Sequence, residues 1–296
     1  SEAISALGPT LFGDNVNLQN GSLGFSVTDV SIAGNNSLPV AITRTFGTKT
    51  AGGAMRGTLP STNRKDSPMG DWDIDLPYVG GTFALSLGWI NSAAGKSAQR
   101  CSVANAAEAT PKSVTVGTNI FPSTSYWHGT RMNLPGRGSQ ALLVVNSASP
   151  RPTGSNAYWT TSSFTAVSCL SSILNGTGEG FIATTTDGTR YWFNWMATAY
   201  DQELTQQRNS GLGYDHLPRG KIGLYATRVE DRFGNWVTYT YSNASNAPVR
   251  LTAINASDSR QITLAHNANG FVQSVSSEGR TWSYEYATDT LTGVVQ

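Results

Sequence analysis

The densest group of acidic side chains lies in residues 70–78, which read Gly-Asp-Trp-Asp-Ile-Asp-Leu-Pro-Tyr. Asp71, Asp73 and Asp75 alternate with apolar residues, which places three carboxylates on one face of a strand. Clustered carboxylates suit a glycosidase or a calcium ion. The calcium-loop pattern is incomplete, because it requires Gly at its sixth position and Glu at its twelfth. The segment therefore favours a half-buried strand with a solvated acidic face over a hydrolase or calcium site.

Cys101 and Cys169 are the 2 cysteines of the chain. They cannot supply a four-ligand zinc site, and no C-x-x-C motif is present. The alternatives are a disulfide and two buried thiols, and a charge-poor, exported β protein favours the disulfide. Such a bridge closes a loop of about 69 residues, for which chain entropy gives about 4 kcal/mol of stabilisation.

Several aromatic side chains stand where they could stack on sugar rings: Tyr126, Trp127, Trp236 and Trp282. Rings on alternating strands also form cross-strand pairs that stabilise a sheet, and the pattern favours this second role. Ser, His and Asp are all present, but no G-x-S-x-G elbow nominates a nucleophile. The sequence therefore predicts no catalytic activity, no metal and no cofactor for this segment.

The composition excludes further classes. The chain has 296 residues, a net charge of +1 and only 13% charged residues. A nucleic-acid-binding protein usually carries a basic face, so we expect no nucleic-acid partner. No apolar run reaches the length of a membrane span. No secretory leader is visible at the first residues, although a processed or cloned fragment would also lack one.

The elements that would position these residues are clearest between Arg228 and Gln296, where one unit recurs. Each copy has a turn, at Asp231–Asn235, Ser257–Arg260 and Ser276–Arg280, followed by a run with apolar or aromatic residues at alternate positions. Alternation predicts strands with one apolar face, and the turn residues permit positive backbone angles. A hairpin of this size is unstable alone, so stacked copies must bury the face together.

The residues that define the copies lie either in the turn or in the aromatic run that follows it. They are Asp231, Gly234, Asn235, Tyr239, Tyr241, Asp258, Arg260, Gly279, Arg280, Tyr284 and Tyr286. A fixed unit of this length indicates a repeat architecture.

These copies resemble the RHS (rearrangement-hotspot) or YD-repeat family of bacterial proteins. The matching pattern is D-x-x-G-[RN]-x-x-x-Y-x-Y, seen in DRFGNWVTYTY and SSEGRTWSYEY and approximately in NASDSRQITLAH. The eponymous Tyr-Asp is replaced by Tyr241-Ser, His266-Asn and Tyr286-Ala. The segment Leu11–Phe46 also resembles the amino-terminal entry region of large RHS proteins.

The resemblance implies an all-β fold, in which antiparallel hairpin repeats form a curved sheet or spiral after an irregular β-rich entry region. It implies a non-catalytic wall segment of a hollow shell that encloses and delivers a carboxy-terminal effector in a bacterial polymorphic toxin. The partners would be the rest of the shell and the effector, and the location the cell surface or the medium. The alternative is an extracellular module that binds cell-surface carbohydrate.

The expected organisation has three parts. Residues 1–197 form the entry or cap region, with three strands between Leu23 and Phe46, a long loop at residues 47–69 and a hairpin at Phe181–Trp195. Residues 198–220 form a polar connection, or an insertion if one continuous sheet runs through both parts. Residues 221–296 hold the repeats and end inside a copy.

Two shorter elements are also expected. Asp201–Gln207 is the only helix candidate in the polar connection. Asp187-Gly188 supplies the tight turn of the earlier hairpin, because Asp-Gly between alternating runs is among the strongest short hairpin signals.

Overall fold

The computed structural model describes residues 14–17, 22–47, 67–70, 72–91, 98–103, 109–145, 156–209 and 211–286. Strands dominate this part of the chain, and α2 (Ser123–Tyr126) is a single helical turn. The sheets are antiparallel. The expected all-β class is therefore confirmed.

Residue contacts divide the chain into two compact units. The larger unit contains Gly34–Leu38 and Leu76–Gln261, and the smaller unit contains Ser1–Ala33, Pro39–Asp75 and Ile262–Gln296. Each unit is considered separately below.

The main sheet of the larger unit is built from consecutive neighbours. Its strands are β10 (Leu143–Val144), β11 (Trp159–Thr160), β12 (Ala166–Leu170), β13 (Gly180–Thr184), β14 (Arg190–Gln207), β15 (Tyr214–Glu230), β16 (Trp236–Tyr241) and β17 (Leu251–Ala256), in that order. A branch of the sheet begins at β15, which also pairs with β5 (Tyr78–Ala84). β5 in turn pairs with β8 (Arg131–Leu134), and β8 pairs with β9 (Gly138–Ala141). A separate hairpin consists of β6 (Val114–Val116) and β7 (Asn119–Phe121).

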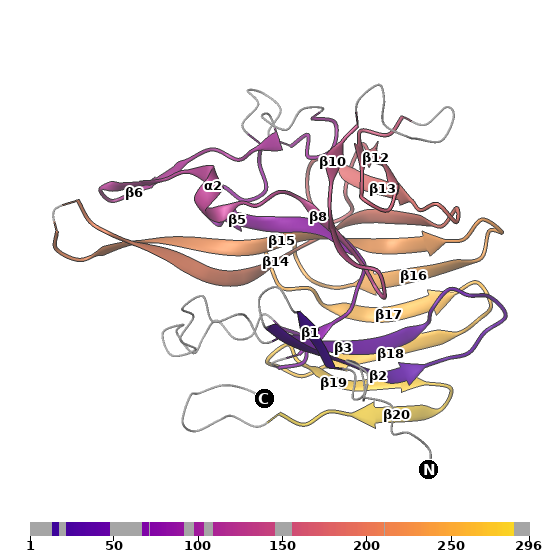
Figure 1. The fold of residues 1–296 in the computed structure, drawn as a ribbon. Helices are drawn as coiled ribbons and strands as arrows, with labels where there is room; N and C mark the ends of the chain where they lie inside the picture. Colours follow the sequence, from indigo (N-terminus) through magenta and orange to yellow (C-terminus); the bar gives the residue numbers. More distant parts are fainter. Residues whose placement is uncertain are drawn as a thin grey trace, which may run out of the picture. The chain divides into compact units, whose positions relative to one another are not determined.

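β14 and β15 form a long ribbon, paired from Arg190↔Glu230 to Gln207↔Tyr214 (Figure 1). The helix expected at Asp201–Gln207 is therefore wrong, because these residues are strand. Residues 198–207 and 214–220 are strand as well, since they form the distal parts of β14 and β15. Their side chains are mostly polar, so they show no clear alternation of apolar and polar residues. The cross-strand hydrogen bonds that hold these residues in strands cannot be read from the sequence.

Close approach between β5 and β15 depends on glycine. A Cβ atom added at Gly80 would lie 2.4 Å from the carbonyl oxygen of Ile222 and 2.8 Å from the Cα atom of Gly223. A larger residue at position 80 would therefore push the branch away from β15.

The core of the larger unit contains an aromatic stack. Trp89 lies between Phe83 and Phe181, with ring centroids 5.3 and 5.8 Å away. The hairpin expected at Phe181–Trp195 is confirmed as β13 and β14, with Gly188 at a positive φ of 86°. Phe181 and Phe193 lie opposite each other in it, and both are buried.

The smaller unit contains a four-stranded sheet in the order β1 (Asp14–Asn17), β2 (Ser22–Ser31), β3 (Ala41–Gly47) and β4 (Asp73–Ile74). The expectation of three strands between Leu23 and Phe46 is wrong. β2 is one strand whose pairing with β3 shifts between Thr28 and Val30, and this irregularity imitates a break in the apolar alternation. Most of the loop expected at residues 47–69 lies outside the described residues.

The other strands assigned to the smaller unit are β18 (Gln261–His266), β19 (Val272–Ser277) and β20 (Arg280–Ser283). Ile262 and Leu264 are buried while Gln261, Thr263 and Ala265 are exposed, which is the period of two expected from the sequence.

Candidate functional site

The turn that joins β15 to β16 is organised by Asp231. The backbone N–H of Asp231 donates to the carbonyl of Asn235 at 2.9 Å, and that of Gly234 donates to the carbonyl of Asp231 at 3.2 Å. The Asp231 carboxylate accepts from the backbone N–H groups of Phe233 and Asn235 and from the Asn235 side-chain amide, at 2.7–3.0 Å. Gly234 has a φ of 86°, in the left-handed region. Burial of Asp231 acts to raise its pKa, but the hydrogen bonds to the carboxylate outweigh this effect, and the pKa is lowered.

The same pattern occurs in three other turns. In each, the first backbone N–H donates to the carbonyl four residues later, and the fourth residue donates back to the first. The fourth residue has a positive φ between 70° and 89°. The four turns span residues 185–189, 231–235, 256–260 and 267–271.

Asp258 and Arg260, in the turn at residues 256–260, form an ion pair in which both side chains are buried. Arg260 Nε lies 2.8 Å from both Asp258 oxygens, and its terminal nitrogens donate to the Leu38 carbonyl and the Asn36 side chain. The hydrogen bond from Arg260 is the main reason why the pKa of Asp258 is lowered. A Cβ atom on Gly34 would lie 2.2 Å from Arg260. These two residues therefore anchor the segment Gly34–Leu38.

The turn between β19 and β20 is of a different type. Ser277 pairs with Arg280, and the two residues between them, Glu278 and Gly279, have φ values of 50° and 74°. Two successive positive φ angles are typical of a type I′ hairpin turn. Gly279 thus shares the left-handed backbone of Gly234 and Ser259 in a shorter loop.

Two carboxylates of the acidic segment, Asp73 and Asp75, lie within the described residues. Asp71 lies outside the described residues, and Asp73 is exposed on β4 beside the buried Ile74. Within the described part of the chain, no three His, Cys, Asp or Glu side chains are placed to hold a metal ion.

The aromatic residues at the end of α2 contribute to packing. Tyr126 is fully buried and its hydroxyl donates to the Lys112 carbonyl. Trp127 packs against the cluster of Ala84, Phe121, Tyr126 and Leu217. Among the described residues its buried Nε1 has no hydrogen-bond partner. The suggestion that Tyr126 stacks on a sugar is therefore wrong, because its ring does not reach solvent.

Trp236 belongs to a ladder of alternating indole and guanidinium groups. Arg228 lies 5.3 Å from the centroid of Trp236 and 5.8 Å from that of Trp192, and Arg190 lies 5.2 Å from Trp192. Glu230 forms ion pairs with both arginines. Its pKa is lowered, chiefly by the hydrogen bond from Arg228. We call this group the Trp–Arg ladder.

In the smaller unit, Trp282 is half-buried on β20 and pairs with the buried Val275 of β19. Tyr284 and Tyr286 follow it. The Tyr284 hydroxyl donates to Asp29 at 2.8 Å, and the Tyr286 hydroxyl donates to the Val272 carbonyl at 2.6 Å.

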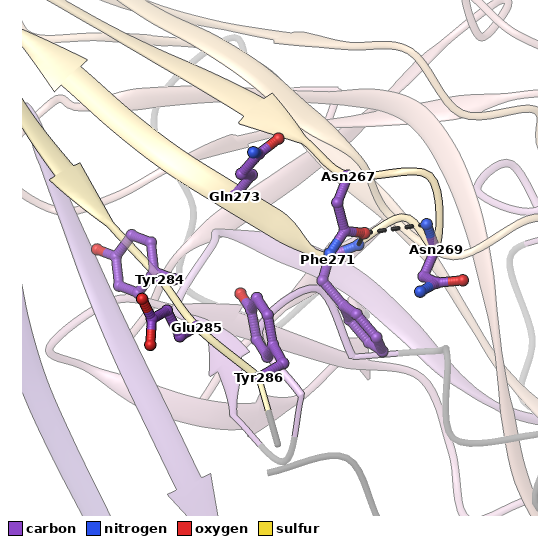
Figure 2. Close-up of a pocket in the computed structure, with 7 residues that line it drawn as sticks. All are labelled: Asn267, Asn269, Phe271, Gln273, Tyr284, Glu285 and Tyr286. Atoms are coloured by element: carbon purple, nitrogen blue, oxygen red, sulfur yellow. Dashed lines mark hydrogen bonds between the residues drawn. The ribbon is translucent and has the colours of Figure 1, made fainter. Parts of the chain in front are cut away.

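These tyrosines line a hollow of about 490 Å³ in the smaller unit, shown in Figure 2. We call it the amide–tyrosine pocket, and its lining residues are Asn267, Asn269, Phe271, Gln273, Tyr284, Glu285 and Tyr286. Phe271 stacks on Tyr286 with ring centroids 4.9 Å apart. The Asn267 side-chain oxygen accepts from the backbone N–H groups of Asn269 and Phe271, so the turn at residues 267–271 forms part of the wall.

Both phenols of the pocket stay protonated at neutral pH. Burial raises the pKa of Tyr286 to about 12, although Arg44 opposes the rise. Burial and the hydrogen bond to Asp29 raise the pKa of Tyr284 further. The wall therefore presents neutral rings, side-chain amides and one carboxylate.

The disulfide between Cys101 and Cys169 is confirmed, with Cα atoms 5.4 Å apart. The segment around Cys101 has other anchors too. The Glu179 carboxylate accepts from the backbone N–H groups of Cys101 and Ser102 at 3.0 and 2.8 Å. Trp159 Nε1 donates to the Cys101 carbonyl at 2.7 Å.

Sequence reasoning missed most of the pocket, including its amide residues and Glu285. The Asn-Ala-Asn-Gly-Phe stretch at residues 267–271 carries a detectable signal, because its Gly stands three residues after the first position, as in Asp231-Arg-Phe-Gly. This turn lies at the opposite end of β18 from the turn at residues 256–260, and the expected copies contain only the latter.

Comparison with known proteins adds no assignment, since no protein-family model matches the sequence and no significant match is found among curated proteins.

Proposed function

We propose that this chain is a wall segment of a hairpin-repeat shell of the RHS kind, which encloses and helps to deliver a carboxy-terminal effector. The observation that carries the proposal is the common hydrogen-bond pattern of the turns at residues 185–189, 231–235, 256–260 and 267–271. A chain that builds successive hairpins with one local device is suited to extension by further copies.

The arrangement of the strands supports the same function. In the larger unit, β10 to β17 follow one another in chain order. In the smaller unit β20 pairs with β19 alone among the described strands, which leaves a second edge for another strand. An unpaired strand edge is a template for pairing.

The Trp–Arg ladder also favours a wall over a sugar-binding surface. A sugar stacks on the open face of a ring. The guanidinium groups of Arg190 and Arg228, however, lie 5.2 and 5.8 Å from the ring centroid of Trp192. Trp236 is likewise in contact with Arg228. Interleaved rings and guanidinium groups of this kind tie neighbouring strands together.

The Cys101–Cys169 disulfide is consistent with export, because disulfides persist in oxidising compartments. A location at the cell surface or in the medium is accordingly part of the proposal.

The test is to purify the native gene product from the organism that encodes this sequence and to image it by electron microscopy. We expect a polypeptide longer than this chain that forms a hollow particle. Its carboxy-terminal region should resist protease until the particle is unfolded. A solid particle, or a carboxy-terminal region that is cleaved as fast as a free domain, would refute the proposal.

A further inference from the structure

The amide–tyrosine pocket has a distinctive charge pattern. Its seven lining residues include no Lys, Arg or His. The phenols donate their protons to Asp29 and to the Val272 carbonyl, so neither offers its proton to a ligand. Glu285 is then the only charged group of the lining. It is exposed, and among the described residues it forms no ion pair.

The two charged side chains that contact Tyr284, Arg44 and Asp29, neutralise one another. Arg44 forms a two-pronged ion pair with Asp29, at 2.6 and 2.9 Å, and its guanidinium lies 5.8 Å from the ring centroid of Tyr284. This arrangement shows that the ring of Tyr284 already accepts a cation on one side. The negative charge of Glu285 therefore dominates the open side of the pocket.

The remaining wall groups suit a cation that carries an apolar stem. The half-buried rings of Tyr284 and Tyr286 offer apolar surface and negative π faces, and the buried Phe271 supports Tyr286 from behind by stacking on it. The side-chain amides of Asn269 and Gln273 offer carbonyl oxygens to N–H donors, whereas the Asn267 oxygen already accepts two backbone N–H groups. Figure 2 shows Glu285 between Tyr284 and Tyr286 along the chain, among the residues that line the pocket.

We propose that the amide–tyrosine pocket binds an alkylammonium or alkylguanidinium group, with Glu285 as the counter-ion and the tyrosine rings around the stem. The group is either a free amine or the basic side chain of a polypeptide, since both present the same chemistry. An anion is repelled by Glu285. A neutral sugar could also donate a hydrogen bond to this carboxylate, but a cationic donor binds a carboxylate more strongly.

The experiment is a titration of the full chain, followed by nuclear magnetic resonance, with n-butylguanidinium and with its neutral analogue n-butylurea. Saturable binding of the cation alone is the expected result, and affinity should fall as salt is raised. A lysine- and arginine-containing peptide forms a second arm, and tighter binding of this peptide identifies a polypeptide as the source.

The matched variants are Glu285→Gln in the pocket and Glu278→Gln in the β19–β20 turn, which change the net charge equally. Glu285→Gln should weaken cation binding about tenfold, and Glu278→Gln about twofold or less. Tyr286→Phe should retain binding, because the ring and not the hydroxyl faces the ligand, whereas Tyr286→Leu should lose it.

Four results would overturn the proposal. The first is equal binding of butylurea and butylguanidinium. The second is an equal effect of the two Glu→Gln variants. The third is the absence of saturable cation binding in the wild-type chain. The fourth is tighter binding of a neutral oligosaccharide in the same titration.

Discussion

Ser259 and Gly234 hold the same position in two turns that share one hydrogen-bond pattern. Each donates its backbone N–H to the residue three positions earlier, at 3.1 and 3.2 Å, and the two φ angles are 70° and 86°. Glycine adopts this region without strain, whereas a residue with a Cβ atom does so at a cost. One turn therefore has the residue that its backbone favours, and the other does not.

Ser259→Gly should stabilise the protein by about 0.5–1 kcal/mol, because it removes this backbone strain. The reciprocal change, Gly234→Ala, should destabilise it by about 1 kcal/mol for the same reason. A Cβ atom at Gly234 meets no atom within 4 Å, so the effect is purely conformational. Urea unfolding measures both. Ser259→Ala is the control, and a gain as large as that of Ser259→Gly would contradict the explanation.

Stability should fall in acid partly through Asp215. This buried carboxylate accepts from Arg208 Nε at 2.8 Å, from the backbone N–H of Thr118 at 2.9 Å and from the Asn119 amide at 3.1 Å. The hydrogen bond from Arg208 is the main reason why its pKa is lowered. A carboxyl whose folded pKa lies below the unfolded value of about 3.9 contributes stability above that value and loses it as the pH falls.

The measurement is the urea midpoint at several pH values between neutrality and acid. Asp215→Asn should be less stable than the wild type at neutral pH, and the difference should shrink as the pH falls below the unfolded pKa. A difference that is constant with pH would show that the ionised carboxylate is not what matters. The Asp215→Asn variant should still lose some stability in acid, because other carboxyls also have lowered pKa values. These are Asp187, Glu230, Asp231 and Asp258.

Alkali should destabilise the fold through its buried tyrosines. The pKa of Tyr286 is raised to about 12 by burial, while an unfolded tyrosine titrates near 10. A group with a raised folded pKa contributes stability below the unfolded pKa and loses it as the pH rises towards the folded value. Between about pH 10 and 12, Tyr286→Phe should therefore lose less stability with pH than the wild type. Identical slopes in the two proteins would contradict this assignment.

Reduction of the Cys101–Cys169 bridge should lower the free energy of unfolding by about 4 kcal/mol, because the bridge closes a loop across a sequence separation of 68. The segment around Cys101 should nevertheless stay in place, since Glu179 and Trp159 bind its backbone. Hydrogen exchange of the Cys101 and Ser102 amides measures this directly.

Glu179→Ala provides the matched comparison for the bridge. In the oxidised protein the variant should expose these two amides only slightly, and in the reduced protein it should expose them strongly. Full exposure of the wild-type segment on reduction alone would show that the disulfide is its sole anchor.

The sequence by itself determined the features that depend on neighbours along the chain. The period of two in Ile262 and Leu264 fixed which residues are buried, and Asp187-Gly188 fixed a hairpin, because side-chain direction and turn geometry are set within a few residues. The left-handed backbone of Gly234 and Gly279 follows from glycine itself.

The tertiary structure alone decided what depends on partners far away in the chain. Asp201–Gln207 is a strand because β15 supplies its hydrogen bonds, which no local pattern reveals. From the sequence, a disulfide and two buried thiols were both possible. The fold brings Cys101 next to Cys169 of β12, and the two form a disulfide. The amide–tyrosine pocket exists because pairing of β19 with β20 brings the turn at residues 267–271 beside Tyr284 and Tyr286. Such contacts depend on strand register. The burial of whole sheet faces determines the register, whereas local propensity does not.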